Sequence, residues 1–265
     1  MSNEHILYLK KLKRKRTLIV AVRILLFVFI IALWEIAGRV GLCDPFIVSS
    51  PARVCRTIAN LYSQNDLFPH ILTTFFETVA GFAAGTALGV LIAVLLWFCP
   101  FIERVLDPYL VVLNALPKIA LGPILIVWVG AGAGAIIVMA LLVSTVVTVM
   151  SVLAGFLEIS ADKLKLMQTL GATRAQTFSK VVLPASVPTI MSALKISVGM
   201  SWVGVIVGEY LVSRRGLGYL IVYGGQVFKL DLVMASIAIL CLLAAVMYYA
   251  VAAFEKRISR RFGRL

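Results

Sequence analysis

The sequence predicts an all-helical integral membrane protein with six transmembrane helices and a cytoplasmic helical hairpin between the fourth and the fifth. Of its 265 residues, 62% are hydrophobic and only 14% are charged. An average soluble domain has about 45–50% apolar and about 25% charged residues. The apolar residues gather in runs that approach the roughly 20 residues needed for a helix to cross a bilayer. No ten-residue stretch alternates with a period of two, so a membrane β-barrel is not predicted.

Six apolar runs define the expected spans, and they cover residues 18–37, 72–97, 108–129, 135–157, 187–210 and 232–254. Together they form one predicted transmembrane domain, residues 18–254. It lies between a basic N-terminal flank, 1–17, and a basic tail, 255–265. The first run follows a basic stretch, as in a signal peptide. It is longer than a signal core and no A-x-A-like cleavage site follows it, so we expect a retained span.

Orientation follows from the basic residues, because Lys and Arg accumulate on the cytoplasmic side of membrane proteins. The N-terminal flank, the C-terminal tail and the loops 98–107 and 158–184 hold 16 of them, and the opposite side holds 6. Both termini and the 158–184 loop are therefore predicted to be cytoplasmic. The net charge of +13 has the same explanation, and nucleic-acid binding is not needed to account for it. Cys43 and Cys55 fall on the opposite side, where free thiols or a disulfide are both compatible with the sequence.

Two of the spans carry local signals. The second has a stripe of glycines four residues apart, which lets another helix approach closely, either within the chain or across a dimer seam. These glycines are Gly81, Gly85 and Gly89. The third span should be irregular, because helix-breaking residues interrupt it. These are Pro117, Gly122 and Pro123.

The loop 158–184 carries the signals of two short helices. Ser160 can cap the first helix. Gly171 suits its end, where a left-handed residue is needed. Thr173 and Gln176 then have the spacing of a capping box, which starts a second helix. The loop is therefore predicted to be a helical hairpin.

The local pattern leaves the purpose of the hairpin open. Pro184 is expected to interrupt the backbone bonding just before the fifth span. A rigid hairpin at that position can dock into a groove of a soluble partner and transmit its movement. It can equally lie on the headgroup surface without any partner.

The hairpin also contains a recognisable motif. Gly171 followed by Val181-x-Leu183-Pro184 resembles the second half of the cytoplasmic signature of bacterial ABC importer permeases, EAA-x3-G-x9-I-x-LP. The first half departs from that signature, since Lys165, Leu166 and Met167 stand where the family has Glu-Ala-Ala.

Other segments extend the resemblance to the nitrate, sulfonate, taurine and bicarbonate branch of these permeases. The matching segments are Ser50-Pro51-x-x-Val54, His70, Ala80-Gly81-Phe82, Leu121-Gly122-Pro123, Trp128-Val129-Gly130 and Arg215-Gly216-Leu217-Gly218-Tyr219-Leu220-Ile221. Each segment alone is a weak signal, and their order along the chain makes the resemblance specific.

The resemblance implies a multi-pass subunit of the bacterial cytoplasmic membrane with three kinds of partner: a second permease copy, two cytoplasmic ATPase subunits and an external solute-binding protein. ATP and Mg²⁺ would bind in the ATPase subunits, and no cofactor is expected in this chain. The sequence has no G-x-x-x-x-G-K-[ST] phosphate loop, so no ATP hydrolysis is predicted here. The hairpin would couple the permease to the ATPase through Lys165, Leu166, Met167, Gly171, Ala172, Thr173, Phe178, Val181, Leu183 and Pro184.

A charge within a span is treated as functional by default, and Lys118 follows Pro117 in the third span. A cation there would suit an anionic solute, although a lysine can also pair with an acid or extend to the interface. The candidate pathway residues are Asn114, Lys118, Trp202 and Glu209. For Lys195 we expect a structural role. Glu77 and Glu209 can each pair with a basic residue or line the outer gate, and we expect structural pairing.

Alternative functions are less compatible with the sequence. A pyrimidine-like or vitamin-precursor solute is the main alternative cargo. A secondary transporter often shows repeated halves, and none is evident. A membrane enzyme needs converging catalytic groups, which the sequence does not supply. A scaffold that recruits an ATPase without transport is compatible with the hairpin.

Overall fold

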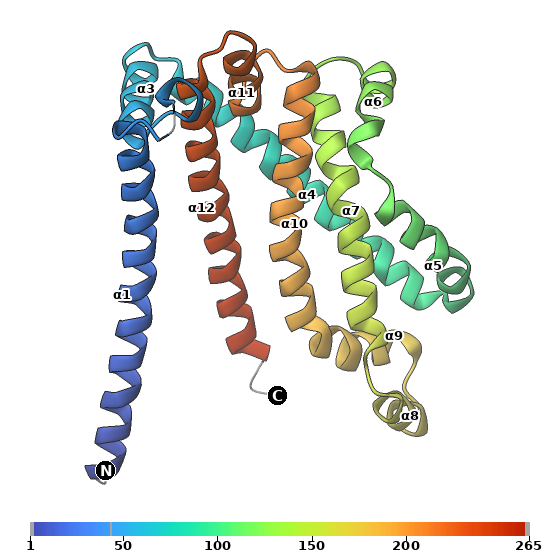
Figure 1. The fold of residues 1–265 in the computed structure, drawn as a ribbon. Coiled ribbons are helices and arrows are strands. Elements are labelled where there is room, and N and C mark those ends of the chain that lie inside the picture. The colour runs from blue at the N-terminus through green and yellow to red at the C-terminus, as the bar shows by residue number, and fades with distance from the viewer. Residues whose placement is uncertain (1–2, 43, 263–265) are drawn as a thin grey trace.

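The computed structural model describes residues 3–42 and 44–262, and within them it contains helices and no strands (Figure 1). The long helices are α1 (Asn3–Arg39), α4 (Leu67–Phe98), α7 (Ala133–Leu157), α10 (Leu183–Val212) and α12 (Leu230–Phe262). The shorter ones are α2 (Pro45–Val48), α3 (Pro51–Ser63), α5 (Pro100–Ala115), η1 (Lys118–Leu121), α6 (Gly122–Val129), α8 (Ala161–Thr169), α9 (Arg174–Thr177), η2 (Phe178–Val182) and α11 (Leu217–Gln226). Within the described residues, five segments are long and apolar enough to cross a membrane, and there are six if the bent pair of α5 and η1–α6 counts as one span.

The third span differs from the single helix expected over residues 108–129. It begins at Pro100, and α5 meets the η1–α6 segment at an angle of 86°. The break falls at Leu116, which is extended (ψ 136°), and Pro117. Proline excludes the helical conformation from the residue before it and donates no backbone hydrogen bond, so the chain turns here. The sequence predicted an irregular span, but not a right-angled one.

The core of the bundle is α7, which packs against α4 on one side and α10 on the other. The glycine stripe of α4 lies on α7: a Cβ at Gly81, Gly85 or Gly89 would collide with the side chain of Ala140, Ser144 or Thr148, respectively. Thr145 Oγ1 also donates to the Gly85 carbonyl at 3.3 Å. The stripe therefore serves packing within the chain, as the first of its two interpretations proposed.

The bundle has two distinct ends. We call one the hairpin end, because α8 and α9 lie there; α1 begins and α12 ends on the same side (Figure 1). We call the other the far end, which holds α2, α3, α6 and α11. Ser50 caps α3 by accepting from the Arg53 N–H at 3.4 Å. The Arg53 guanidinium in turn pairs with Asp231 of α12 at 2.7 Å.

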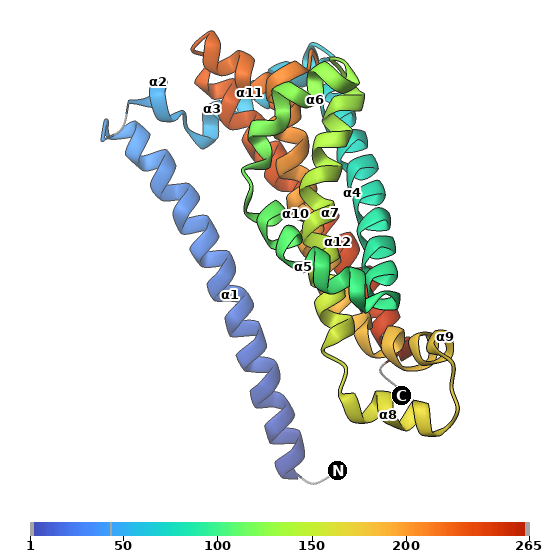
Figure 2. The same cartoon turned by 90° about the vertical axis from the view of Figure 1, so that its right-hand side faces the viewer.

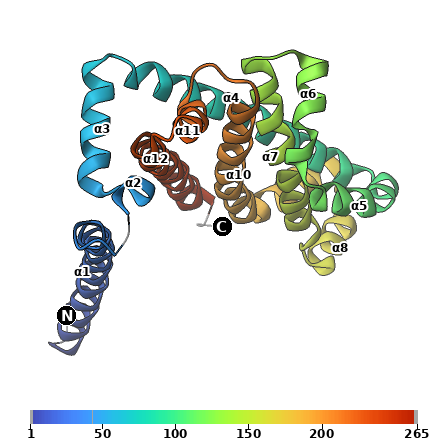
Figure 3. The same ribbon diagram turned by 45° about the horizontal axis from the view of Figure 1, so that its top comes forward.

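Helix α1 stands away from the rest of the bundle (Figures 2 and 3). No residue of its most apolar window is buried, and its exposed side chains include Leu25 and Phe27. It is joined to the far end through Glu35, whose Oε2 accepts from the Ala52 N–H at 3.1 Å. Its apolar surface is thus free to contact lipid or another protein chain.

Candidate functional site

The first helix of the predicted hairpin has the expected boundaries. Ser160 Oγ accepts from the Lys163 N–H at 3.4 Å at the start of α8. At the other end, Gly171 has φ +70° and the Ala172 N–H donates to the Met167 carbonyl at 3.0 Å. No atom lies within 4 Å of a Cβ built on Gly171, so the glycine is favoured there by backbone conformation and not by space.

The second half of the hairpin begins with the predicted capping box. The Thr173 N–H donates to Gln176 Oε1 at 2.8 Å, and the Gln176 N–H donates to Thr173 Oγ1 at 3.3 Å. The expected interruption at Pro184 is wrong: α9 continues through the π-helical turn η2 into α10. A π-turn widens the helix locally, and here it directly precedes the proline, which lacks an N–H. The second half of the hairpin is thus continuous with the fifth span.

An aromatic cluster fixes the base of the hairpin to the bundle. The ring of Phe178 lies 5.0 Å from Trp97, 5.3 Å from Phe98 and 5.3 Å from Phe156, between ring centroids. Val182, one turn further on, is fully buried. Because Trp97 and Phe98 end α4 and Phe156 ends α7, the hairpin base moves with three spans.

The tip of the hairpin presents apolar side chains outward. Leu166 is 59% exposed and Leu170 is 71% exposed. Of the three residues that replace Glu-Ala-Ala, Lys165 and Leu166 are exposed and Met167 is half-buried. The predicted coupling residues therefore separate into an exposed tip in α8 and a base in η2 that is packed against the bundle.

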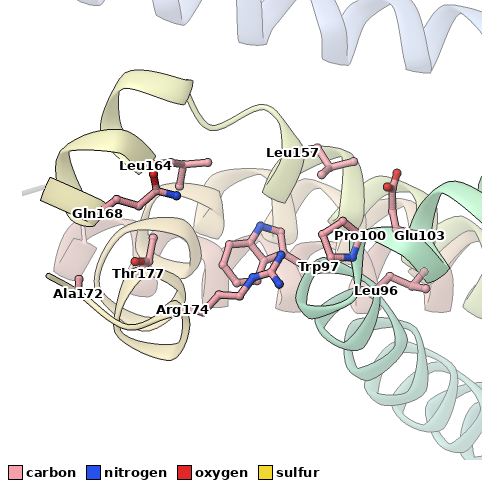
Figure 4. A pocket seen from close by; sticks show the side chains of 10 residues that line it. All are labelled: Leu96, Trp97, Pro100, Glu103, Leu157, Leu164, Gln168, Ala172, Arg174 and Thr177. Atoms are coloured by element: carbon pink, nitrogen blue, oxygen red, sulfur yellow. The ribbon is translucent and has the colours of Figure 1, made fainter.

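A cavity of about 450 Å³ separates the tip from the bundle (Figure 4). The ends of α4, α5 and α7 form one wall, and the hairpin forms the other. The Arg174 guanidinium lies over the Trp97 ring, 5.6 Å from its centroid, and Glu103 lines the cavity from α5. The hairpin tip thus stands off the bundle while its base is packed.

Two of the candidate pathway residues lie together. Lys118 Nζ donates to the Asn114 carbonyl at 3.0 Å and lies 3.5 Å from Asn114 Oδ1. This places an ammonium group over the carbonyl that the helix break leaves free. Trp202 is 6% exposed and packs with Val198 and Met247, so in this conformation it is a core residue.

The fourth candidate, Glu209, lies at the far end and is 1% exposed. Its neighbour is another acid, Glu77. In the described residues, neither acid forms the salt bridge with a basic residue that was expected for it. Lys195 does pair with an acid, Glu255 of α12, at 2.9 Å. In the sequence, His70, Glu77 and the 215–221 segment are separate signals. Their assembly around Glu209 requires contacts between residues far apart in the chain, which no local pattern reports.

The helices, the hairpin and the broken third span are those of a multi-span membrane protein. Residues 85–261 match the family described as binding-protein-dependent transport system inner membrane component. The chain therefore belongs to this family, the permease subunits of ABC importers, and to its sulfonate and taurine branch.

Particular relatives share most of the chain's length. SsuC of Bacillus subtilis (strain 168), named for aliphatic sulfonate transport, is 28% identical over 89% of this chain and 86% of its own. ThiX of Halalkalibacterium halodurans, a formylaminopyrimidine transport permease, is 29% identical over 74% of this chain and 77% of its own. A chain of the inward-facing MetNI methionine ABC transporter has the same fold, with a TM-score of 0.65 at 21% identity over 72% of this chain and 95% of that chain.

Proposed function

We propose that this permease forms the membrane pathway for a small anionic solute, which an external binding protein delivers and a separate ATPase drives through the membrane. The hairpin end and both termini then lie in the cytoplasm, and ATP and Mg²⁺ bind in the ATPase. The excess of basic residues near the hairpin end supports this orientation. The similarity to SsuC supports an anionic solute.

The observation that carries the coupling role is the mechanical continuity of the hairpin. Its exposed apolar tip suits a groove on a soluble ATPase, and its base runs without interruption into α10. A displacement of the tip therefore turns or shifts a membrane span, where a flexible loop would absorb it.

A second copy of this chain is the proposed partner within the membrane. The described part of α5 has no buried residue, and on α6 the side chains of Val127 and Trp128 are 82% and 77% exposed. Lipid can cover such a surface, but a solute pathway needs a second wall. A homodimer that pairs the broken spans would place two Lys118 side chains along one pathway.

Lys118 provides the test of the solute. In proteoliposomes that contain the whole importer, Lys118→Ala should reduce uptake of an alkyl sulfonate about tenfold, because a charged hydrogen bond contributes about 1.5–3 kcal/mol. Lys118→Arg retains the positive charge and should retain most of the uptake.

A pyrimidine-like solute is the second candidate, and the similarity to ThiX favours it. A neutral solute needs no cation in the pathway. If Lys118→Ala and the wild type take up the solute at equal rates, the anionic assignment is wrong and formylaminopyrimidine uptake becomes the next assay.

A further inference from the structure

The loop between α10 and α11, residues 213–216, and the first residues of α11 are fastened to two spans by their own backbone. Three consecutive N–H groups donate to side chains of α4 and α10. Gly216 donates to His70 Nδ1 at 2.9 Å, Leu217 to Thr74 Oγ1 at 2.7 Å and Gly218 to Glu209 Oε2 at 2.5 Å. We call these three bonds the far-end latch. Successive N–H groups at a helix start favour an anion, and the Glu209 carboxyl group occupies that position.

The glycines of the loop are required by this arrangement. Gly216 has φ +119°, and a Cβ on it would collide with the Glu209 carboxyl group. A Cβ on Gly218 would lie 2.7 Å from Glu209 Oε2. The loop is therefore built around this one carboxyl group, which belongs to the end of the fifth span.

A second carboxyl group lies beside the first. Glu77 on α4 faces Glu209 on α10 closely enough for the two carboxyl groups to interact electrostatically, and the residues are 6% and 1% exposed. Two of their oxygens, Glu77 Oε2 and Glu209 Oε1, are buried and receive no hydrogen bond from any group in the described residues. Two adjacent carboxylates repel each other strongly in a dry environment, and these two oxygens have no donor to offset the repulsion.

The surrounding elements do not neutralise this pair. Helix α7, which packs against both α4 and α10, has no ionisable side chain along its length. The ionisable neighbours are His70 and Asp66 near the start of α4, Tyr210 on α10, Tyr219 on α11, and Arg214 and Arg215 on the loop. Both arginines are exposed, and in the described residues neither carboxyl group has a salt bridge.

We propose that Glu77 and Glu209 form a proton-binding site in which one proton is shared between the two carboxyl groups. One protonated carboxyl and one carboxylate supply the donor that both unpartnered oxygens lack. The carboxylate is Glu209, because it accepts the Gly218 N–H at the start of α11, and Glu77 carries the proton. Glu77 also lines a far-end cavity of about 540 Å³, together with Ser213, Arg214 and Arg215, so the proton has a route to water.

The far-end latch then depends on this proton. When Glu77 loses it, two buried negative charges face each other, and Glu209 is held less firmly at the Gly218 N–H. The loop that carries Arg214 and Arg215 opens more often. Protonation of the pair closes the loop onto α4 and α10, and deprotonation loosens it.

Amide hydrogen exchange of residues 216–218 tests this proposal, with the full chain in lipid nanodiscs. The pH should run from about 7 to about 9.5, a range above the ordinary pKa of histidine and below those of tyrosine and lysine. Protection is the measured rate relative to the intrinsic rate at the same pH. In the wild type it should fall about tenfold or more with rising pH, the loss expected for a charge-assisted hydrogen bond.

Two variants and one spectrum complete the test. Glu77→Gln keeps a permanent donor beside Glu209, so protection should stay high at every pH, and Glu209→Ala should give low protection throughout. The infrared spectrum of the wild type should show a protonated-carboxyl C=O band that Glu77→Gln lacks. The proposal is overturned if the band is the same in both proteins, or if Glu77→Gln loses protection with pH as the wild type does. If a variant fails to fold, the wild-type spectrum still tests the proposal, because a wild type without a protonated-carboxyl band at pH 7 would overturn it.

Discussion

Gly204→Leu should prevent this chain from forming a stable bundle. A Cβ at position 204 would lie 2.5 Å from the Ala140 Cα and 3.0 Å from the Ala140 N, and both atoms are backbone of α7. Overpacking against side chains typically costs about 1–3 kcal/mol, and a helix backbone has less room to adjust. We therefore expect a loss above about 3 kcal/mol, measured as a lower thermal midpoint and a loss of monodisperse protein in detergent.

The same helix supplies the matched control. No atom lies within 4 Å of a Cβ built on Gly199, and this residue is exposed on the bundle surface. Gly199→Leu adds the same bulk and the same change in backbone propensity. It should leave the thermal midpoint near that of the wild type. Equal losses for the two variants would show that the contact between α7 and α10 is not what position 204 protects.

The second large effect is expected at the hairpin tip. Leu166→Asp combined with Leu170→Asp should abolish co-purification of the ATPase, while the thermal midpoint of the permease stays unchanged because both side chains are exposed. Burying a leucine is worth about 1.5–3 kcal/mol. Losing two such contacts should weaken binding more than about a hundredfold. Retained co-purification would place the ATPase contact elsewhere on the chain.

A change at the hairpin base should distinguish binding of the ATPase from coupling of ATP hydrolysis to the solute. Phe178→Ala removes the ring that contacts Trp97, Phe98 and Phe156, but it leaves the tip intact. This variant should still bind the ATPase, while stimulation of ATP hydrolysis by a solute-loaded binding protein should fall. If tip and base variants behave alike, the hairpin does not divide into a docking part and a transmitting part.

The features that the sequence predicted correctly are those that depend on residues close together in the chain. The Ser160 cap, the left-handed Gly171 and the Thr173 capping box each depend on neighbours within a few residues, and all three are confirmed. The six apolar runs were found because hydrophobic length is also a local property.

The structural features that the sequence did not predict depend on contacts between residues far apart in the chain. Proline at position 117 signals a break, but the angle of 86° depends on what α5 and α6 pack against. The π-turn before Pro184 carries Val182, which packs against residues of α4 and α7, and such contacts are not visible in a local pattern. The far-end latch joins His70 to Gly216 across 146 positions, and no motif within either segment reveals that pairing.

ATPase activity of the reconstituted importer, with wild-type chain or with Gly171→Pro, tests the central claim most directly. Proline holds φ near −65°, whereas Gly171 has φ +70° and its N–H donates to the Gln168 carbonyl at 3.0 Å. Gly171→Asn is the control, since asparagine tolerates the left-handed region. We predict that a solute-loaded binding protein stimulates the wild type and the asparagine variant but not the proline variant. Stimulation of the proline variant to the wild-type level would contradict a coupling role for the hairpin.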